Sequence, residues 1–464
     1  MIDFKKIEGL YFIGIGGIGM SALALYFANG DFTIGGYDRN QSRITDKLTK
    51  EGCMITYNDD PEMIPELFKN KINTGRVLVV YTLAIPSDNK IITYFRNHQY
   101  RILKRSEILG EISDKTDTLA VAGTHGKTTI STMIAHLLKQ SHVDCSAFLG
   151  GISKNYDTNL LSGKGKFTVI EADEFDRSFL HLKPLMAVIT ALDADHLDIY
   201  GDRDTMVKAY NEFCRRIRQG GILLVNTRIL EDILVPEGVT CLTYGFEDKA
   251  DYRSFNIQSK GDHYIFSLAT PSETLENLHF AFPGIINVEN ITAAIAIAML
   301  CGATVEEIRK AMVTFTGVRR RFDIRLNIPG LAYVDDYAHH PEEIKAFITS
   351  AKAYFKGRKI TGIFQPHLFS RTFDHAAGFA SCLDELDEVI LLPIYPAREK
   401  PIPGVTSGLI YDKMKSVNKK LLKKEDLPGM LETEKLDVLV TIGAGDIDTL
   451  VLPIEEKLKK NRDK

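Results

Sequence analysis

The fold of this chain is decided by the stretch Thr118-Leu-Ala-Val-Ala-Gly-Thr-His-Gly-Lys-Thr-Thr129. An apolar β-type run, residues 119–122, leads into glycines, and apolar residues then recur at helical spacing. Strand, glycine turn and helix in this order form a phosphate cradle, because glycines let backbone N–H groups turn inward and the helix N-terminus adds partial positive charge. Lys127 can reach the β- and γ-phosphates, and the Thr128 hydroxyl can bind Mg²⁺. The predicted nucleotide loop is Gly123-Thr124-His125-Gly126-Lys127-Thr128-Thr129.

This loop is a short variant of the general phosphate-loop pattern. The general pattern has a glycine where Val121 stands, and here the upstream glycine is Gly123. The alternative is an ordinary glycine turn capped by threonine. The coincidence of strand, Gly-Lys-Thr and helix favours phosphate binding over that alternative.

Composition restricts the class of protein. A chain of 464 residues predicts two to four domains, and 44% hydrophobic with 25% charged residues is typical of a globular protein. A net charge of −4 argues against broad nucleic-acid binding. Six widely spaced cysteines without a CxxC pair predict reduced thiols in a cytoplasmic protein. No run approaches the roughly 18–20 apolar residues of a membrane span, so no membrane insertion is expected.

A second glycine motif lies near the N-terminus. Gly14-Ile15-Gly16-Gly17-Ile18-Gly19 follows a predicted strand at 10–15 and precedes a predicted helix at 20–27. Its glycines explain this uncharged run better than a signal peptide does. Asp38 ends a second predicted strand, about where a dinucleotide fold places a ribose-binding acid. Taken alone, the motif favours NAD(P) or FAD, although any diphosphate can use the same turn.

Acidic side chains follow two later predicted strands. The strand at 167–170 leads into Glu171, Asp173 and Glu174, and the strand at 185–189 leads into a segment with His196 among aspartates. Carboxylates at strand ends beside a phosphate loop are suited to hold Mg²⁺. Short alternating segments at 252–257 and 263–268 predict a small antiparallel sheet.

The C-terminal part resumes a strand–helix alternation after three adjacent arginines, 319–321, which we interpret as a hinge with at least one phosphate contact. Predicted strands at 331–334, 360–364, 388–392 and 438–442 each end in a polar loop, and ligands bind at such ends in open α/β sheets. The lysine-rich stretch 413–424 is predicted to be a solvated helix face.

Seven motifs occur in a defined order along nearly the whole chain: Gly14–Ala22, Gly123–Thr129, Glu171–Glu174, Asp195–Asp198, Asp335-Asp-Tyr-Ala-His-His-Pro341, Gln365-Pro-His-Leu-Phe-Ser-Arg-Thr372 and Tyr395-Pro-Ala-Arg-Glu399. Together these motifs resemble those of the Mur ligase family of bacterial cell-wall synthesis. The resemblance implies an α/β fold with three domains: a Rossmann-like UDP-sugar domain at 1–112, a P-loop ATPase domain with a mostly parallel sheet at 113–317, and a C-terminal Rossmann-like domain at 318–464.

The resemblance also implies roles for individual residues. It places two Mg²⁺ ions, with Thr128 and Glu171 on one and His196 on the other. Asn290, Arg321 and Asp336 match positions at the ATP site. The implied UDP-sugar residues are Gly14, Gly16, Gly17, Ile18, Gly19, Asp38 and Arg105. The implied catalytic residues are Lys127, Glu171, Glu174, His196, Arg321 and His339, and the implied amino-acid-binding residues are His340 and Arg371.

The activity implied is ATP-dependent ligation. The last three motifs are most similar to those of members that join L-alanine to UDP-N-acetylmuramate through an acyl phosphate, in the cytoplasm, as monomers or weak homodimers. The chain departs from the family at Ile286, where histidine is usual, at Gly35-Gly-Tyr-Asp38, where Ser-Gly-Ser-Asp is usual, and at Ala191-Leu192-Asp193.

Three other functions stay open from the sequence. A recycling ligase would add a preformed tripeptide to the same UDP-sugar, and the segment 365–372 argues against it. An NAD-dependent oxidoreductase built on Gly14 to Gly19 would leave the phosphate loop and the acidic segments unexplained. A non-catalytic nucleotide-binding regulator would not need the complete set of metal-binding side chains.

Overall fold

The computed structural model describes residues 2–69, 75–193, 200–261, 263–397, 399–431 and 433–460. Two compact units divide the chain: residues 1–258, 265–280 and 288–316 form the first, and residues 259–264, 281–287 and 317–464 form the second. None of the helices described is long and apolar enough to cross a membrane.

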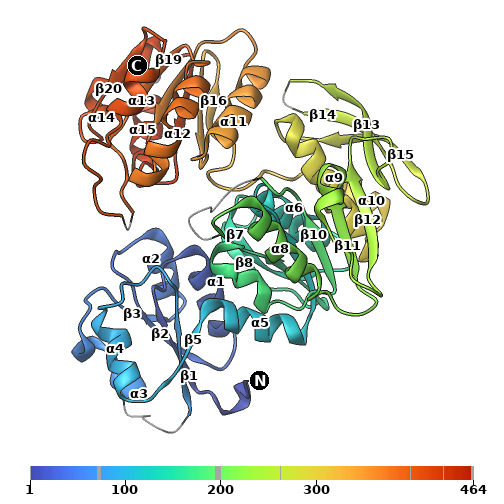
Figure 1. The fold of residues 1–464 in the computed structure, drawn as a ribbon, viewed down its shortest axis with the longest axis vertical. Helices are drawn as coiled ribbons and strands as arrows, with labels where there is room; N and C mark the ends of the chain where they lie inside the picture. Colours follow the sequence, from blue (N-terminus) through green and yellow to red (C-terminus); the bar gives the residue numbers. More distant parts are fainter. Residues whose placement is uncertain are drawn as a thin grey trace. The chain divides into compact units, whose positions relative to one another are not determined.

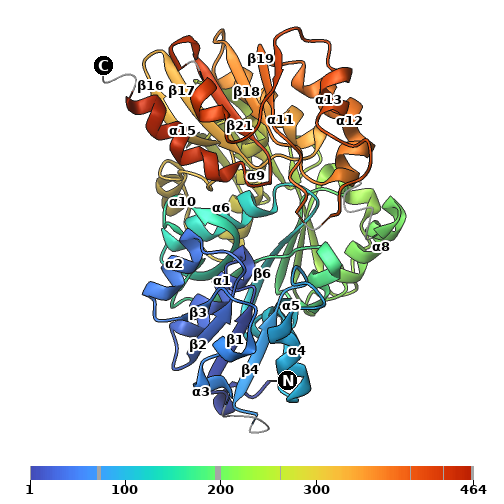
Figure 2. The same ribbon diagram turned by 90° about the vertical axis from the view of Figure 1, so that its left-hand side faces the viewer.

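The first unit begins with a five-stranded parallel sheet in the order β3-β2-β1-β4-β5. Its central strand β1 is buried along its whole length, because helices cover both faces of a parallel sheet. The strands are β1 (Gly9–Ile13), β2 (Thr33–Tyr37), β3 (Met54–Thr56), β4 (Val77–Tyr81) and β5 (Arg101–Lys104), shown in blue in Figures 1 and 2. The helices are α1 (Ile18–Ala28), α2 (Arg43–Lys50), α3 (Glu66–Lys69), α4 (Lys90–Asn97) and α5 (Arg105–Lys115), with short 3₁₀ turns at Phe4–Lys6 and Pro61–Met63.

A ten-stranded sheet completes the first unit, in the order β15-β14-β13-β12-β11-β10-β6-β9-β7-β8. Its centre is parallel, and β8 runs antiparallel to β7. The strands are β6 (Asp117–Ala122), β7 (Cys145–Ser153), β8 (Thr158–Leu161), β9 (Phe167–Glu171), β10 (Met186–Ile189), β11 (Ile222–Asn226), β12 (Thr240–Gly245), β13 (Tyr252–Ser259), β14 (Tyr264–Ala269) and β15 (Thr274–Phe280). The helices are α6 (Lys127–Lys139), α8 (Arg203–Cys214), α9 (Ile285–Leu300) and α10 (Val305–Met312), with 3₁₀ segments η3 (Phe175–His181) and η4 (Thr227–Asp232).

The predicted separate antiparallel sheet is wrong in one respect. β13, the first of its strands, pairs in parallel with β12 through Tyr244↔Tyr252, so β13 to β15 extend the central sheet. A capping box begins α10: the Thr304 side chain accepts from the Glu307 N–H, and the Glu307 carboxylate accepts from the Thr304 N–H.

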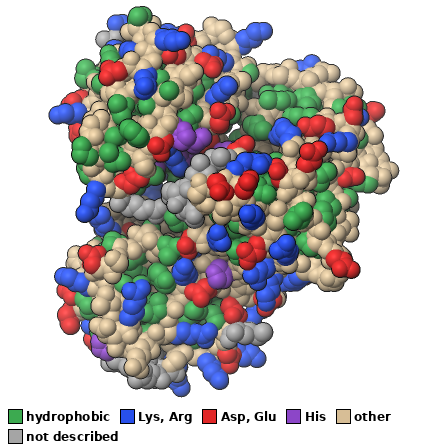
Figure 3. Space-filling view, viewed as in Figure 1, with side chains coloured by type: hydrophobic (Ala, Val, Ile, Leu, Met, Phe, Trp, Pro, Cys, Tyr) green, Lys and Arg blue, Asp and Glu red, His purple; other side chains and the backbone are tan. Residues whose placement is uncertain are grey.

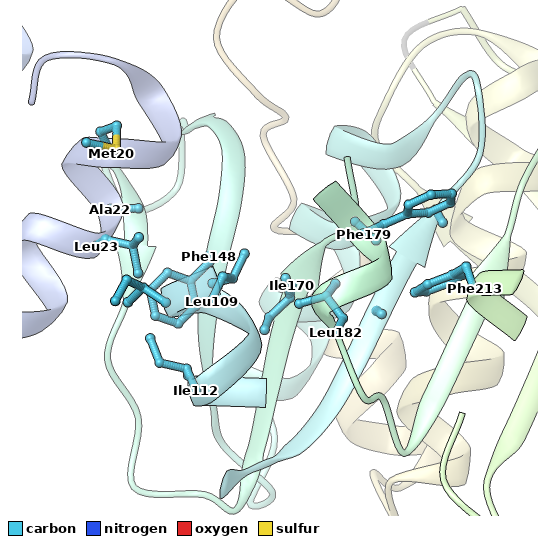
Figure 4. Close-up of a cluster of buried hydrophobic side chains, with 14 of the residues drawn as sticks. Met20, Ala22, Leu23, Leu109, Ile112, Phe148, Ile170, Phe179, Leu182 and Phe213 are labelled. Atoms are coloured by element: carbon cyan, nitrogen blue, oxygen red, sulfur yellow. The ribbon is translucent and has the colours of Figure 1, made fainter. Parts of the chain in front are cut away.

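One hydrophobic core joins the two sheets of the first unit. Helices α1 and α5 lie between them, and side chains from both pack against strands and helices of the ten-stranded sheet. Figure 4 shows this cluster, with Leu23 and Leu109 near Phe148 and Ile170. Helix α1 carries no charged residue and buries most of its surface, because it packs against both sheets. The glycine motif before α1 is thereby fixed relative to the central sheet.

The second unit holds a six-stranded sheet in the order β16-β17-β21-β18-β19-β20, parallel except for the β16–β17 pair. The strands are β16 (Asp323–Ile328), β17 (Leu331–Asp336), β18 (Ile360–Phe364), β19 (Glu388–Leu391), β20 (Lys419–Leu421) and β21 (Val438–Ile442). The helices are α11 (Pro341–Tyr354), α12 (Phe369–Leu383), α13 (Gly408–Lys413), α14 (Leu427–Met430) and α15 (Asp448–Lys460), with a 3₁₀ turn at Thr433–Lys435.

The helix predicted for the lysine-rich stretch 413–424 is wrong. Residues 419–421 form β20, which pairs in parallel with β19 through Val389↔Lys419 and Leu391↔Leu421. Lys419 turns back and donates to the carbonyls of Tyr411 and Met414 at 2.8 and 2.6 Å. Lysine on an edge strand also discourages pairing with another chain.

Candidate active site

The nucleotide loop joins the end of β6 to the start of α6, as the sequence predicts. Gly123 and Gly126 have φ of +133° and +81°, values that only glycine adopts readily. A Cβ at Gly123 would lie 2.0 Å from Thr190 Oγ1, and one at Gly126 would lie 3.1 Å from Asn290 Oδ1. The predicted nucleotide residue Asn290, on α9, therefore lies next to the loop.

Residues that follow β10 hold this loop from the side. Thr190 Oγ1 donates to the His125 carbonyl at 2.5 Å, and the Thr124 N–H donates to the Ala191 carbonyl at 3.0 Å. The Asp193 N–H donates to Thr124 Oγ1 at 3.1 Å. Sequence reasoning did not assign Thr190 a role. These contacts preorganise the loop, because they fix its backbone without using the inward-facing groups at the helix N-terminus.

Lys127, the first residue of α6, is held by three acceptors. Its Nζ donates to the carbonyls of Gly123 and Thr124 at 2.6 and 3.4 Å and to Glu174 Oε1 at 2.8 Å. Burial disfavours the charge of Lys127, but Glu174 and the carboxylates near it outweigh burial and raise the pKa of Lys127. Burial raises the pKa of Glu174, which is only 1% exposed, against the influence of Lys127.

The predicted metal ligands Thr128 and Glu171 meet beside this lysine. Thr128 Oγ1 donates to Glu171 Oε1 at 2.9 Å, and the Gly150 N–H donates to Glu171 Oε2 at 2.9 Å. The third predicted ligand, His196, lies outside the described residues. No group of three or more His, Cys, Asp or Glu suited to a metal occurs among the residues described. A hydroxyl and a carboxylate nevertheless fit Mg²⁺, which prefers oxygen donors and retains several waters.

The N-terminal glycine motif forms a turn between β1 and α1, where α1 begins at Ile18 with Gly17 as its N-cap. Gly14 has a φ of +87°, and the Gly16 N–H donates to Asp38 Oδ2 at 2.8 Å. A Cβ at Gly19 would lie 2.8 Å from Arg105 Nη1, so the Arg105 guanidinium packs directly on the motif. The seven residues predicted for the UDP-sugar are therefore brought together.

Arg105 also faces the acidic segment that follows β9. Its Nη2 lies 3.6 Å from Asp173 Oδ2, and the neighbouring Lys104 pairs with Asp176 at 2.9 Å. Asp176 and Arg177 both have left-handed backbone, with φ of 53° and 55°. Strained residues of this kind cluster at functional sites, where surrounding contacts hold them.

In the second unit the predicted residues cluster at the end of β17 and the start of α11. Asp336 Oδ2 accepts from the Phe322 N–H at 2.6 Å and Oδ1 from the Ala338 N–H at 2.8 Å. Burial raises the pKa of Asp336 to about 6. The guanidinium of Arg321 lies 5.2 Å from the ring centre of Tyr337, in cation–π range.

The adjacent histidines differ in their surroundings. His339 Nδ1 lies 3.0 Å from the Tyr337 carbonyl, and burial lowers the pKa of His339 to about 4. The charge of Arg371, on α12, also opposes protonation of His339. The His340 ring lies 4.7 Å from that of His375. Glu343 Oε2 accepts from the backbone N–H groups of both residues at 2.9 and 3.3 Å, a role that sequence reasoning did not find.

Of the three adjacent arginines, Arg320 serves the fold of the second unit. Its Nε lies 3.3 Å from Asp335 Oδ2, and its Nη2 donates to the Gly443 carbonyl. Its φ of +64° places it in the left-handed region. Arg320 therefore links β17 to the end of β21, and both Arg320 and Arg321 lie within cation–π range of the Tyr337 ring.

Three family models match consecutive parts of the chain: "Mur ligase family, catalytic domain" at residues 9–116, "Mur ligase middle domain" at 121–298 and "Mur ligase, glutamate ligase domain" at 320–445. The chain belongs to the Mur ligase family. It has the three-domain α/β fold of that family, with a parallel N-terminal sheet, a mostly parallel central sheet and a mixed C-terminal sheet.

Individual Mur ligases are similar over the full length. The UDP-N-acetylmuramate–L-alanine ligase of Parabacteroides distasonis is 49% identical over 99% of both chains, and that of Porphyromonas gingivalis is 49% identical over 98% of this chain and 99% of the relative. The crystal structure of the UDP-N-acetylmuramate-alanine ligase MurC from Thermotoga maritima matches with a TM-score of 0.79 and 28% identity, covering 98% of this chain and 99% of that one. A murein peptide ligase from Psychrobacter arcticus, with a TM-score of 0.71 and 22% identity, shares the fold.

Proposed function

We propose that this Mur ligase joins L-alanine to the lactyl carboxylate of UDP-N-acetylmuramate at the expense of ATP, in peptidoglycan precursor synthesis. The observation that carries the proposal is full-length similarity at 49% identity to ligases named for this reaction. The nucleotide loop supports it, because Lys127 pairs with Glu174 and the Thr128 hydroxyl donates to Glu171.

The chemistry needs two transfers. A carboxylate oxygen of the UDP-sugar attacks the γ-phosphorus of ATP, so that an acyl phosphate forms and ADP leaves. The amine nitrogen of L-alanine then attacks the acyl carbon, a C–N bond forms, inorganic phosphate leaves and the amine loses a proton. Phosphorylation is required because an unactivated carboxylate would have to expel oxide.

Residues of the first unit act on phosphates and on the UDP-sugar. Lys127 supplies positive charge to the transferred phosphoryl group, and the preformed loop aligns it, so catalysis is mainly positioning and charge neutralisation. Thr128 and Glu171 would hold Mg²⁺, which supplies further charge neutralisation when bound. We assign the diphosphate of the UDP-sugar to the Gly14–Gly19 turn and to Arg105, whose guanidinium packs on that turn.

Residues of the second unit act on the amino acid and on the proton. Arg371 can bind the L-alanine carboxylate through two parallel hydrogen bonds. With a pKa of about 4, His339 is neutral at physiological pH and can accept a hydrogen bond from the amine, although it is a weak base. The domain boundaries 1–112, 113–317 and 318–464, the second Mg²⁺ on His196, and a monomeric or weakly dimeric state remain part of the proposal.

The charge on the surface is mixed, which suits small anionic substrates bound at defined sites. On the face drawn in Figure 3, Lys and Arg side chains are interspersed with Asp and Glu.

All six cysteines are free, as expected where thiols stay reduced, and we place the reaction in the cytoplasm.

Phosphate release from MgATP tests the proposal. UDP-N-acetylmuramate is supplied with each candidate amino acid in turn, and with the tripeptide used by recycling ligases. Release that requires both the UDP-sugar and L-alanine is expected. Phosphate release with the tripeptide and not with L-alanine would show that the protein is a recycling ligase. Absence of release with either would reject ligation.

A further inference from the structure

Gly150 lies on β7 at a point where the strand leaves its regular pairing. The parallel register with β9 runs to Phe148↔Ile170, and the antiparallel register with β8 is interrupted between Phe148 and Ser153. The backbone N–H of Gly150 instead donates to Glu171 Oε2 at 2.9 Å. Since Thr128 Oγ1 donates to the other carboxylate oxygen at 2.9 Å, two donors from separate elements fix both oxygens of Glu171.

Space at Gly150 is limited by that same carboxylate. A Cβ built on Gly150 would lie 2.1 Å from Glu171 Oε2 and 2.3 Å from both Cδ and Oε1. Contacts below 3.0 Å force a shift, so any side chain at position 150 would push the carboxylate away from the Gly150 N–H and from Thr128. Gly150 is exposed, and its backbone is outside the left-handed region. Alanine is therefore compatible with the backbone at position 150, and the crowding there comes from Glu171.

We propose that Gly150 is a positioning residue for metal binding, because its N–H and its lack of a side chain hold the Glu171 carboxylate in the orientation that presents Oε1 beside the Thr128 hydroxyl. The inference rests on the proposed function, in which Thr128 and Glu171 bind Mg²⁺. Partners that orient a metal-binding carboxylate typically affect metal affinity by about 10–100-fold. A purely structural role would affect the stability of β7, whereas the proposed role acts only through the Glu171 carboxylate.

The test is a Gly150→Ala variant, with Gly429→Ala as its matched control. Gly429, on α14, also lies outside the left-handed region, and a Cβ there would meet nothing within 4 Å. Calorimetry measures ADP binding to the full chain at a series of Mg²⁺ concentrations and in the absence of metal. Mg²⁺ is expected to strengthen ADP binding, and the Mg²⁺ concentration that gives half of this gain is the quantity compared. In Gly150→Ala this concentration should be about 10–100-fold higher than in wild type. Metal-free ADP binding and the melting temperature should match those of wild type and of Gly429→Ala.

A Glu171→Ala background separates this role from a general distortion of β7. If Gly150 acts through the carboxylate, adding Gly150→Ala to Glu171→Ala should change neither the Mg²⁺ requirement nor metal-free ADP binding further. An unchanged Mg²⁺ requirement in the single variant would overturn the inference and leave the proposed function standing. Weaker metal-free ADP binding, or a further loss in the double variant, would also overturn it. Absence of any Mg²⁺ effect on ADP binding in wild type would overturn the inference together with the assignment of Mg²⁺ to Thr128 and Glu171, whereas ligation itself is tested by phosphate release.

Discussion

Replacing Lys127 with methionine should separate catalysis from stability at the nucleotide loop. Methionine is also unbranched and only one atom shorter than lysine, and it carries no charge. Loss of one preorganised hydrogen-bond donor to a transition state typically costs about 2.7–4 kcal/mol, so turnover should fall by at least about 10²–10³-fold when the lost donor also carries charge. The assay is steady-state phosphate release with all three substrates saturating.

The same substitution leaves Glu174 buried without its lysine. Glu174 is 1% exposed, and its Oε1 lies 2.8 Å from Lys127 Nζ. Removing one partner of a buried pair costs about 3–5 kcal/mol, and protonation of the raised-pKa Glu174 should hold the loss near the lower end. The melting temperature of the Lys127→Met variant should therefore fall below that of wild type.

A second substitution distinguishes the two effects. Lys127→Met combined with Glu174→Gln no longer buries an unpaired charge, so the melting temperature should recover while turnover stays low. Near-normal turnover in Lys127→Met would refute the assignment of the nucleotide loop. A melting temperature that does not recover in the double variant would refute the buried ion pair as the source of the lost stability.

Further predictions concern the amino acid, pH and the loop. Arg371→Lys should raise the half-saturating L-alanine concentration far more than that of ATP, because lysine cannot offer two parallel hydrogen bonds; equal increases for both substrates would reject its role at the carboxylate. The pKa of Asp336 is about 6 in the folded protein and near 4 in the unfolded chain, so its stabilising contribution is present below about pH 4 and is lost as pH rises through about 6. The free energy of unfolding should therefore decline by up to about 3 kcal/mol over this window, and Asp336→Asn should remove that decline. His339 has the opposite sign: its contribution is present above its unfolded pKa near 6.5 and is lost as pH falls through about 4, and His339→Gln should abolish that component in the same pH series of denaturation curves. Thr190→Val removes the hydroxyl that donates to the His125 carbonyl, and ADP affinity measured by calorimetry should weaken about 3–10-fold for the loss of one net hydrogen bond; unchanged affinity would show that the loop does not depend on this contact.

Local patterns predicted much of this molecule. The run of apolar residues before Gly123 and the helical spacing after Lys127 were sufficient to place the nucleotide loop between β6 and α6. The same reasoning found Glu171 at the end of β9 and the glycine turn before α1. These features depend on residues adjacent in the sequence, where strand and helix periodicities act directly.

Contacts between distant segments were not predictable from those patterns. The Thr190 hydroxyl reaches His125 across 65 positions, and no periodicity signals that approach. The Gly150-Gly151 pair inside a strand did carry a usable signal, since glycine in a strand often marks close approach of another group. The helix predicted over 413–424 was wrong at residues 419–421, because lysines on a short edge strand give the same polar pattern as lysines on a solvated helix face.

The most direct test of the central claim is transfer of oxygen from substrate to phosphate. UDP-N-acetylmuramate labelled with ¹⁸O in its lactyl carboxylate is incubated with MgATP and L-alanine, and the inorganic phosphate and the UDP-sugar product are analysed by mass spectrometry. An acyl phosphate predicts one ¹⁸O in the phosphate for each amide bond formed, and only when all three substrates are present. Phosphate without label, or labelled phosphate without a product heavier by one alanine residue, would contradict ligation through this intermediate.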